Sequence, residues 1–356
     1  MKTLFIPKEE THFYAESCSV SSVFHCFTQV RKKKKKKHIE EIRRRKFSIG
    51  GKPNPLIEDL HQAVKNLSAE LYTTDMLISS WSSFRHYLVY YLDLFDKIFI
   101  LNIRIRNIVK TFKHTDWFPY FYSTIALLVQ NAEDNQYLVR VNPTLEFIIT
   151  STDIAATGAA ATLLIFNNEK GFSRQNIESI CSVGQSTKKG NRSSGYIGEK
   201  GIGFKSVFLV TAQPYIFSNG YQISFNENPC PQCSLGYIVP EWVEEKPTRL
   251  LDIKQIYGKD SLPTTTLVLP LKADKINSVK QQLSSIHPEI LSFLSKIRDF
   301  SVREDNEDPK MESVTTVSIS SEINSAAKKN LNAESYTIHL SAGENGNDEK
   351  VCSYYM

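Results

Sequence analysis

Apolar and polar positions alternate at strand spacing in several segments of the second half of the chain. The segments 145–151 (LEFIITS) and 162–167 (TLLIFN) predict strands, and the second is nearly all apolar, as expected for a strand in the middle of a sheet. The segment 215–226 (YIFSNGYQISFN) predicts a β-hairpin, because an Asn-Gly pair between two apolar runs favours a two-residue turn. The segment 264–271 (TTTLVLPL) predicts a further strand.

Helical spacing marks four other segments. Apolar residues recur every three or four positions in 55–75, and the segment 127–135 (LLVQNAEDN) ends an apolar helical run. The segment 173–184 (SRQNIESICSVG) predicts a helix that its first serine caps, with two isoleucines and a cysteine on one face. The sequence from 276 to 300 also predicts a helix, interrupted by a His-Pro pair.

Strand spacing returns near the end of the chain, in 314–322 and 336–342. Because strands and helices are mixed without a strict βαβ repeat, the predicted fold class is α+β. We expect three parts: a low-order, disordered basic arm at 1–50, a folded domain at 51–300, and the start of a following, truncated region at 301–356.

The segment 77–126 interrupts this organisation. It holds thirteen aromatic residues in fifty positions and has no Gly, Glu, Gln or Cys. That composition is typical of translated AT-rich non-coding DNA, and we hypothesise a retained intron or a gene-model error. The alternative is a lipophilic insertion whose aromatic surface must be covered. Charges interrupt its apolar runs well before the ~18 residues that a transmembrane helix needs, so no membrane partner is expected.

Positive charge is concentrated at the start of the chain. The formal net charge is +5, yet the first 50 residues carry 13 Lys/Arg against 5 Asp/Glu. The main source is the run 31–37 (RKKKKKK), reinforced by four more basic residues up to Lys46. Such a run indicates a nuclear-import signal, a phosphate-seeking tail or simply a solvated arm. Nucleic acid is therefore expected as a partner only through the segment 31–46.

The cysteines bear on the cellular compartment. Six cysteines at scattered positions favour a reducing environment, so we expect a nuclear or cytosolic protein. Only Cys230 and Cys233 (CPQC) have the spacing of metal ligands. One such pair is half of a zinc site, and a turn with two ordinary thiols is the alternative.

A glycine-rich stretch, 195–206 (GYIGEKGIGFKS), carries the clearest hint of ligand chemistry. Glycine-dense loops that lead into a helix let backbone N–H groups approach a phosphate. The order Gly198-x-x-Gly201-x-Gly203 fits neither the P-loop nor the dinucleotide fingerprint. A glycine-rich turn of structural purpose is the alternative.

Three further motifs favour the phosphate interpretation. They are QNAEDN at 130–135, LLIFNNEKGF at 163–172 and the polar loop VGQSTKKGNRSSG at 183–195. The ordered set resembles the GHKL superfamily of ATP-binding domains, which includes heat-shock chaperone ATPases, DNA gyrase B, MutL and histidine kinases. In detail the motifs look like those of plant NO VEIN-type proteins, which are related to the sacsin repeat. The resemblance runs from about Ile39 to Tyr355, apart from the aromatic segment.

The resemblance implies a two-layer α/β sandwich, the Bergerat fold, with helices over a mixed sheet and ATP between the helices and a lid. Asn131 matches the asparagine whose side-chain oxygen coordinates Mg²⁺ at the ATP phosphates. An amide oxygen suits this hard cation, which keeps several waters. Asp134, one helical turn later, is expected to face the same pocket.

The base and the phosphates have their own expected contacts. The superfamily's adenine-binding aspartate corresponds to Asn167, and Glu169 replaces the glycine that follows it in the motif. The same resemblance implies nucleotide contacts from the rest of that motif, from a lid lysine, from the glycine loop and from a strand threonine. These residues are Asn168, Gly171, Lys188, Gly198, Gly201, Gly203, Phe204, Lys205 and Thr265. For Lys188 a surface lysine, and for Thr265 a strand-stabilising residue, are the alternatives.

One departure from the superfamily pattern concerns hydrolysis. Hydrolysing members place a general-base glutamate four residues before the magnesium asparagine, and here that position is Leu127, which cannot accept a proton. The resemblance therefore implies an ATP-dependent conformational switch or chaperone-like factor, with a role in plant development and weak or absent hydrolysis. The alternative is a pseudo-ATPase that acts as an interaction scaffold. Homodimer formation is a further possibility that the sequence leaves open.

Overall fold

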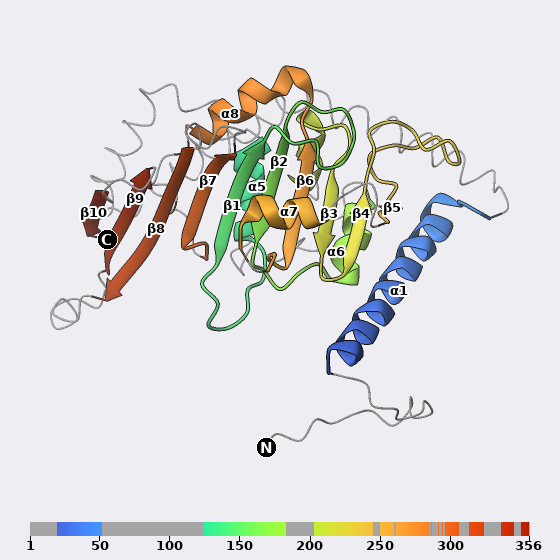
Figure 1. Cartoon of the computed structure of the whole chain (residues 1–356), viewed down its shortest axis with the longest axis horizontal. Helices are drawn as coiled ribbons and strands as arrows, with labels where there is room; N and C mark the ends of the chain where they lie inside the picture. Colours follow the sequence, from blue (N-terminus) through green and yellow to red (C-terminus); the bar gives the residue numbers. More distant parts are fainter. Residues whose placement is uncertain are drawn as a thin grey trace, which may run out of the picture.

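The structure, a computed structural model, describes residues 20–51, 124–182, 203–244, 250–259, 261–284, 286, 291, 294, 296–305, 313–323, 336–344 and 350–355. Ten strands form one sheet in the order β10-β9-β8-β7-β1-β2-β6-β3-β4-β5 (Figure 1). The β1–β7 pair is parallel and the other neighbouring strands are antiparallel. The predicted α+β class is confirmed, with a mixed sheet.

The middle of the sheet is formed by β1 (Thr144–Thr150), β2 (Thr162–Asn167) and β6 (Thr265–Pro270). Every residue of β2 and β6 is buried, so the prediction of a central strand is confirmed. Alternate residues of these strands enter two separate cores, one on each face of the sheet. This burial on both faces explains why β2 reads as a continuous apolar run.

The predicted hairpin is formed by β3 (Tyr215–Ser218) and β4 (Tyr221–Ser224). Asn219 and Gly220 both have positive φ, 48° and 79°, which is the geometry that the Asn-Gly pair favours. The short strand β5 (Glu241–Trp242) pairs with β4 and ends the described sheet.

The other half of the sheet corrects the extent of one predicted helix. It consists of β7 (Asp299–Asp305), β8 (Ser313–Ile323), β9 (Tyr336–Glu344) and β10 (Lys350–Tyr355). The helix predicted for 276–300 is wrong at its end, because Phe300 belongs to β7, where it is buried and packs its ring against Phe147 of β1 at 5.5 Å. The domain boundary expected at residue 300 falls within β7, so the same sheet continues across it.

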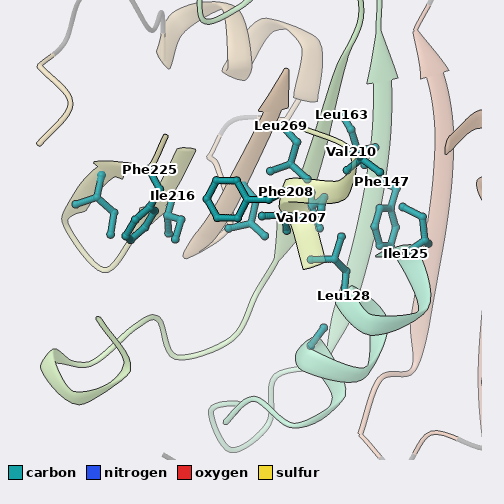
Figure 2. Close-up of a cluster of buried hydrophobic side chains, with 14 of the residues drawn as sticks. Ile125, Leu128, Phe147, Leu163, Val207, Phe208, Val210, Ile216, Phe225 and Leu269 are labelled. Atoms are coloured by element: carbon teal, nitrogen blue, oxygen red, sulfur yellow. The ribbon is translucent and has the colours of Figure 1, made fainter. Parts of the chain in front are cut away.

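Most described helices share one core with the sheet. They are α5 (Thr124–Glu133), α6 (Arg174–Ile180), the 3₁₀ helix η3 (Gly203–Leu209) and α8 (Ile276–Ser284), which follows η4 (Ala273–Lys275). Figure 2 shows this core, where Ile125 and Leu128 of α5 gather with Val207 and Phe208 of η3 and with Phe147. The helix α7 (Leu250–Tyr257) contributes to the second core instead, across the sheet.

The predicted cap of α6 is confirmed. Ser173 accepts a hydrogen bond from the Asn176 backbone N–H, and the Asn176 side chain accepts one from the Ser173 N–H, so a capping box starts the helix. The predicted apolar face is also present, because Ile177 and Cys181 are 0% and 1% exposed.

The expectation of a disordered basic arm is wrong for its second half. Residues 20–47 form the helix α1 (Val20–Phe47), which lies beside β4 and β5 (Figure 1). Ile39, Ile42 and Phe47 are at most 3% exposed and belong to the main core. Their spacing places them along one side of the helix, and burying that side gives the basic segment a fixed structure.

Several predictions lie outside the described residues. These are the helix at 55–75, the aromatic segment up to residue 123, the polar loop 183–195 and the glycine positions 198 and 201. The last three residues of the aromatic segment, 124–126, form the first turn of α5.

Candidate functional site

Three polar side chains meet where three neighbouring strands begin or end. Asn167 is the last residue of β2 and pairs in register with Thr265, the first residue of β6. Thr265 in turn pairs with Ser218, the last residue of β3. All three are at most 4% exposed. The antiparallel register thus brings together Asn167 and Thr265, which the sequence predicts as base-binding residues.

A hydrogen-bond network joins these side chains to Tyr137 and Glu169. The Asn167 amide Nδ2 donates to the Tyr137 hydroxyl at 2.9 Å, and the Asn167 Oδ1 accepts from the Glu169 backbone N–H at 2.8 Å. The Thr265 hydroxyl donates to the Glu169 Oε1 at 2.7 Å and lies 2.6 Å from the Ser218 hydroxyl. We call these five residues the strand-end cluster.

The Tyr137 hydroxyl also connects the strand-end cluster to α5. It donates to the Ala132 carbonyl oxygen at 2.8 Å. Burial raises the pKa of the Tyr137 hydroxyl far above its usual value, so the group stays protonated and keeps its role as a donor. One side chain therefore links the C-terminal turn of α5 to the end of β2.

Asn131 precedes Ala132 on that same turn. Its Nδ2 is buried and has no hydrogen-bond partner among the described residues. Buried amide groups in proteins almost always have a hydrogen-bond partner, and a bound ligand can supply one where the protein itself does not. Asp134, the other residue predicted on this turn, is 3% exposed.

Two further side chains of α5 bear on the expectation of weak or absent hydrolysis. Leu127, where the superfamily pattern has its general base, is partly buried and one turn before Asn131. Glu133 is a carboxylate on the same helix, but it accepts hydrogen bonds from the Lys296 and Ile297 backbone N–H groups at 2.8 and 3.1 Å. Glu133 therefore anchors the segment before β7, a structural task that the sequence pattern did not reveal.

Asn168 and Gly171 have structural contacts in the strand-to-helix connection. The Asn168 side chain accepts from the Thr144 N–H at 2.9 Å and donates to the Asn142 carbonyl oxygen at 2.7 Å, so it fixes the chain before β1. Gly171 has φ of +89°, and a Cβ there would lie 2.7 Å from the Asn219 Cβ. Only glycine tolerates both that backbone conformation and that close approach.

The start of η3 lies beside the end of α6. Phe204 is partly buried against Phe225, with 6.4 Å between the ring centroids. Lys205 is 2% exposed, its ammonium donates to the Ser182 carbonyl oxygen, and burial lowers the pKa of Lys205 to about 8. Lys46 of α1 donates to the Ser182 hydroxyl at 2.5 Å. Two ammonium groups thus hold Ser182, the last described residue before the polar loop.

The cysteine pair is part of a tight turn. The Cys233 N–H donates to the Cys230 carbonyl oxygen at 3.2 Å. Within the described ranges, no group of three or more His, Cys, Asp or Glu side chains is arranged to hold a metal ion. None of the described helices combines the length and apolar character that crossing a membrane requires.

Sequence reasoning missed Tyr137 and Ser218 and named Glu169 only as a departure. Ser218 was accessible in principle, because it ends the first strand of a predicted hairpin. Tyr137 carries no such signal, since its role depends on contacts with both α5 and β2.

Comparison with known proteins gives two matches. Residues 100–230 match the family described as "Sacsin domain". The Arabidopsis thaliana protein named "Protein NO VEIN" is 41% identical over 180 residues, which cover 48% of this chain and 6% of that protein. The chain therefore spans a small part of the length of this relative. Both matches support a relationship of this chain to NO VEIN-type and sacsin-like proteins.

Proposed function

We propose that this chain is an ATP-binding module of GHKL type that acts as a nucleotide-dependent conformational switch. The observation that carries the proposal is the buried polar cluster at the ends of β2, β3 and β6, joined through Tyr137 to the turn of α5 that bears Asn131. The superfamily resemblance assigns base recognition to the strand-end cluster and magnesium binding to Asn131.

Base recognition in this proposal involves two side chains. The Asn167 Oδ1 accepts one hydrogen bond from the Glu169 N–H, and a carbonyl oxygen has a second lone pair for the adenine amino group. Glu169 places a buried carboxylate against Thr265, two residues after the position where the superfamily has its aspartate. Glu169 would thereby supply the negative charge that Asn167 lacks.

Magnesium would be held by the Asn131 amide oxygen together with the ATP phosphates. The unpaired, buried Nδ2 of Asn131 fits a side chain whose polar partners arrive with a ligand. A Mg²⁺ ion bound mainly by phosphates and waters needs few protein ligands, so it requires no cluster of carboxylates. The remaining phosphate contacts, from Asp134, Lys188, Gly198, Gly201, Gly203, Phe204 and Lys205, are proposed from the resemblance.

The switch would operate through Ser182. Lys46 of α1 and Lys205 of η3 both donate to this residue, which directly precedes the loop that the resemblance makes the lid. A lid movement on nucleotide binding would pull on Ser182 and so change the packing of α1. Hydrolysis would be weak or absent, because Leu127 cannot act as a base.

The test is equilibrium binding of a fluorescent ATP analogue with Mg²⁺ to the folded chain. We expect saturable binding that unlabelled ATP competes away. Thr265→Val should weaken it about tenfold, because valine no longer donates to the Glu169 carboxylate that the proposal sets beside the base, and one lost buried hydrogen bond costs about 1–1.5 kcal/mol. Asn228→Ala, at an exposed loop position, is the matched control and should bind like the unmodified chain. A folded chain without saturable binding would contradict the proposal.

Turnover tests the role of residue 127 separately. Leu127→Glu in the full chain should raise ATP hydrolysis from near zero to a slow, measurable rate, because it restores a base at the expected position. The substitution is a better test than a deletion of residues 77–126. The deletion would remove 124–126, which form the first turn of α5, together with Ile125, which is 2% exposed. Equal rates for Leu127→Glu and the unmodified chain would count against the general-base argument.

The second candidate is a pseudo-ATPase that serves as an interaction scaffold. It is favoured by the closed network at Asn167, whose amide N–H and carbonyl groups both have partners within the protein. Under this alternative the cluster is purely structural, and the binding experiment above separates the two. In either form, we propose a nuclear or cytosolic protein of plant development or a chaperone-like factor.

A further inference from the structure

The basic run of α1 is a structural feature that nucleotide binding does not use. Its seven consecutive basic residues, 31–37, extend over about two helical turns and so point to all sides of the helix. Some of them have partners on the protein: the Lys35 ammonium lies 4.2 Å from the centre of the Tyr221 ring, and the Lys36 ammonium pairs with Glu244 at 2.5 Å. Arg31, Lys33, Lys34 and Lys37 are exposed.

The helix is held in a fixed position on the domain. Ile39 and Ile42 are fully buried, and the Arg43 guanidinium donates to the Pro240 carbonyl oxygen at 2.7 Å. The Nδ1 atom of the buried His38 ring lies 2.8 Å from the Tyr221 hydroxyl. The four exposed cations therefore lie on an anchored helix, so a ligand that meets them loses less entropy than it would with a flexible tail.

We propose that this exposed face of α1, formed by Arg31, Lys33, Lys34 and Lys37, binds the phosphate backbone of duplex nucleic acid. Residues four apart on a helix lie about 6 Å from each other. Duplex DNA carries one charge per about 1.7 Å of its axis, so each cation can meet a phosphate. The run contains no acidic residue that would repel the backbone.

The apolar side of α1 at residues 39–47 argues against two other kinds of partner for this part of the helix. A helix that lies on a membrane needs an exposed apolar face, and so does a helix that enters a receptor groove. In the part of α1 whose side chains are described, residues 29–47, that side, with Ile39, Ile42 and Phe47, is buried against the domain. Of the helix residues whose exposure is described, Val30 is the large hydrophobic side chain that is exposed, at 43%. Charge is thus the property that this face offers.

The test measures fluorescence anisotropy of a labelled 20-base-pair duplex with the full chain, at salt concentrations from 50 to 200 mM. Four phosphate contacts predict a slope of about −3.6 for the logarithm of the binding constant against the logarithm of salt, or ~150-fold weaker binding over that range. The variant Lys33→Gln, Lys34→Gln, Lys37→Gln removes three contacts and should leave a slope of about −0.9. Glutamine keeps a high helix propensity, and circular dichroism checks that α1 persists.

The matched control, Lys254→Gln, Lys259→Gln, Lys275→Gln, removes the same charge from α7, the residues after it and η4. It should keep the slope of the unmodified chain. If the two triple variants reduce the salt slope equally, the proposal is overturned, because binding would then depend on net charge and not on this face of α1. Binding to vesicles with 20% phosphatidylserine but not to the duplex would overturn it in favour of a membrane surface.

Discussion

Tyr137 joins α5 to the strand-end cluster, and removing its hydroxyl tests that link. Tyr137→Phe keeps the ring and deletes both the bond to the Ala132 carbonyl and the bond from the Asn167 Nδ2. Asn167 is 4% exposed, so water cannot readily replace the lost partner. An unsatisfied buried donor costs about 1–3 kcal/mol, and we expect the free energy of unfolding to fall by about 2 kcal/mol.

The assay is urea denaturation at pH 7, followed by circular dichroism. Tyr257→Phe is the matched control: its hydroxyl donates to Glu146 at 2.8 Å, but Glu146 also accepts from Lys259 at 2.8 and 2.9 Å. The remaining donor limits the control's loss to about 1 kcal/mol or less. A double-mutant cycle with Asn167→Leu should return a coupling energy of about 1 kcal/mol. If Tyr137→Phe costs no more than Tyr257→Phe, the link carries no stability and the reasoning is refuted.

Two further predictions follow from individual residues. Gly171→Ala should lower the free energy of unfolding by about 2–4 kcal/mol, because the new Cβ combines a φ of +89° with a 2.7 Å approach to Asn219; a melting temperature within about 1 °C of the unmodified chain would contradict this. Lys205 has its pKa lowered to about 8 by burial, so between pH 8 and the ordinary lysine value the unfolded chain binds more protons and stability rises with pH. Lys205→Met should remove that rise. The measurement is the free energy of unfolding of both chains at pH 8 and at pH 10; if the variant shows the same increase as the unmodified chain, other groups cause it.

Much of the fold was predictable because its signals are local. The capping box at Ser173, the Asn-Gly turn and the apolar run of β2 each depend on residues close in sequence. The motifs also name Asn167 and Thr265 together, and these two residues pair in register at the strand ends.

The errors concern features that depend on distant contacts. The lysine run conceals the spacing of Ile39, Ile42 and Phe47, and that side of α1 becomes stable only against the sheet. Phe300 lies in a segment whose sequence predicts a helix, yet the parallel pairing of β7 with β1 decides its conformation. Likewise Glu133 gains its role only through backbone groups at 296–297. Tertiary contacts override local propensity in each case.

The proposed function depends above all on the binding of ATP and magnesium by Asn131 and the strand-end cluster. The decisive measurement is calorimetric titration of ATP into the unmodified chain and into Asn131→Ala, each with Mg²⁺ and with EDTA. We predict that Mg²⁺ tightens binding to the unmodified chain by about tenfold or more, a gain of about 1.4 kcal/mol, and that Asn131→Ala loses this gain. Equal Mg²⁺ dependence in the two chains, or no binding to either, would contradict the proposal.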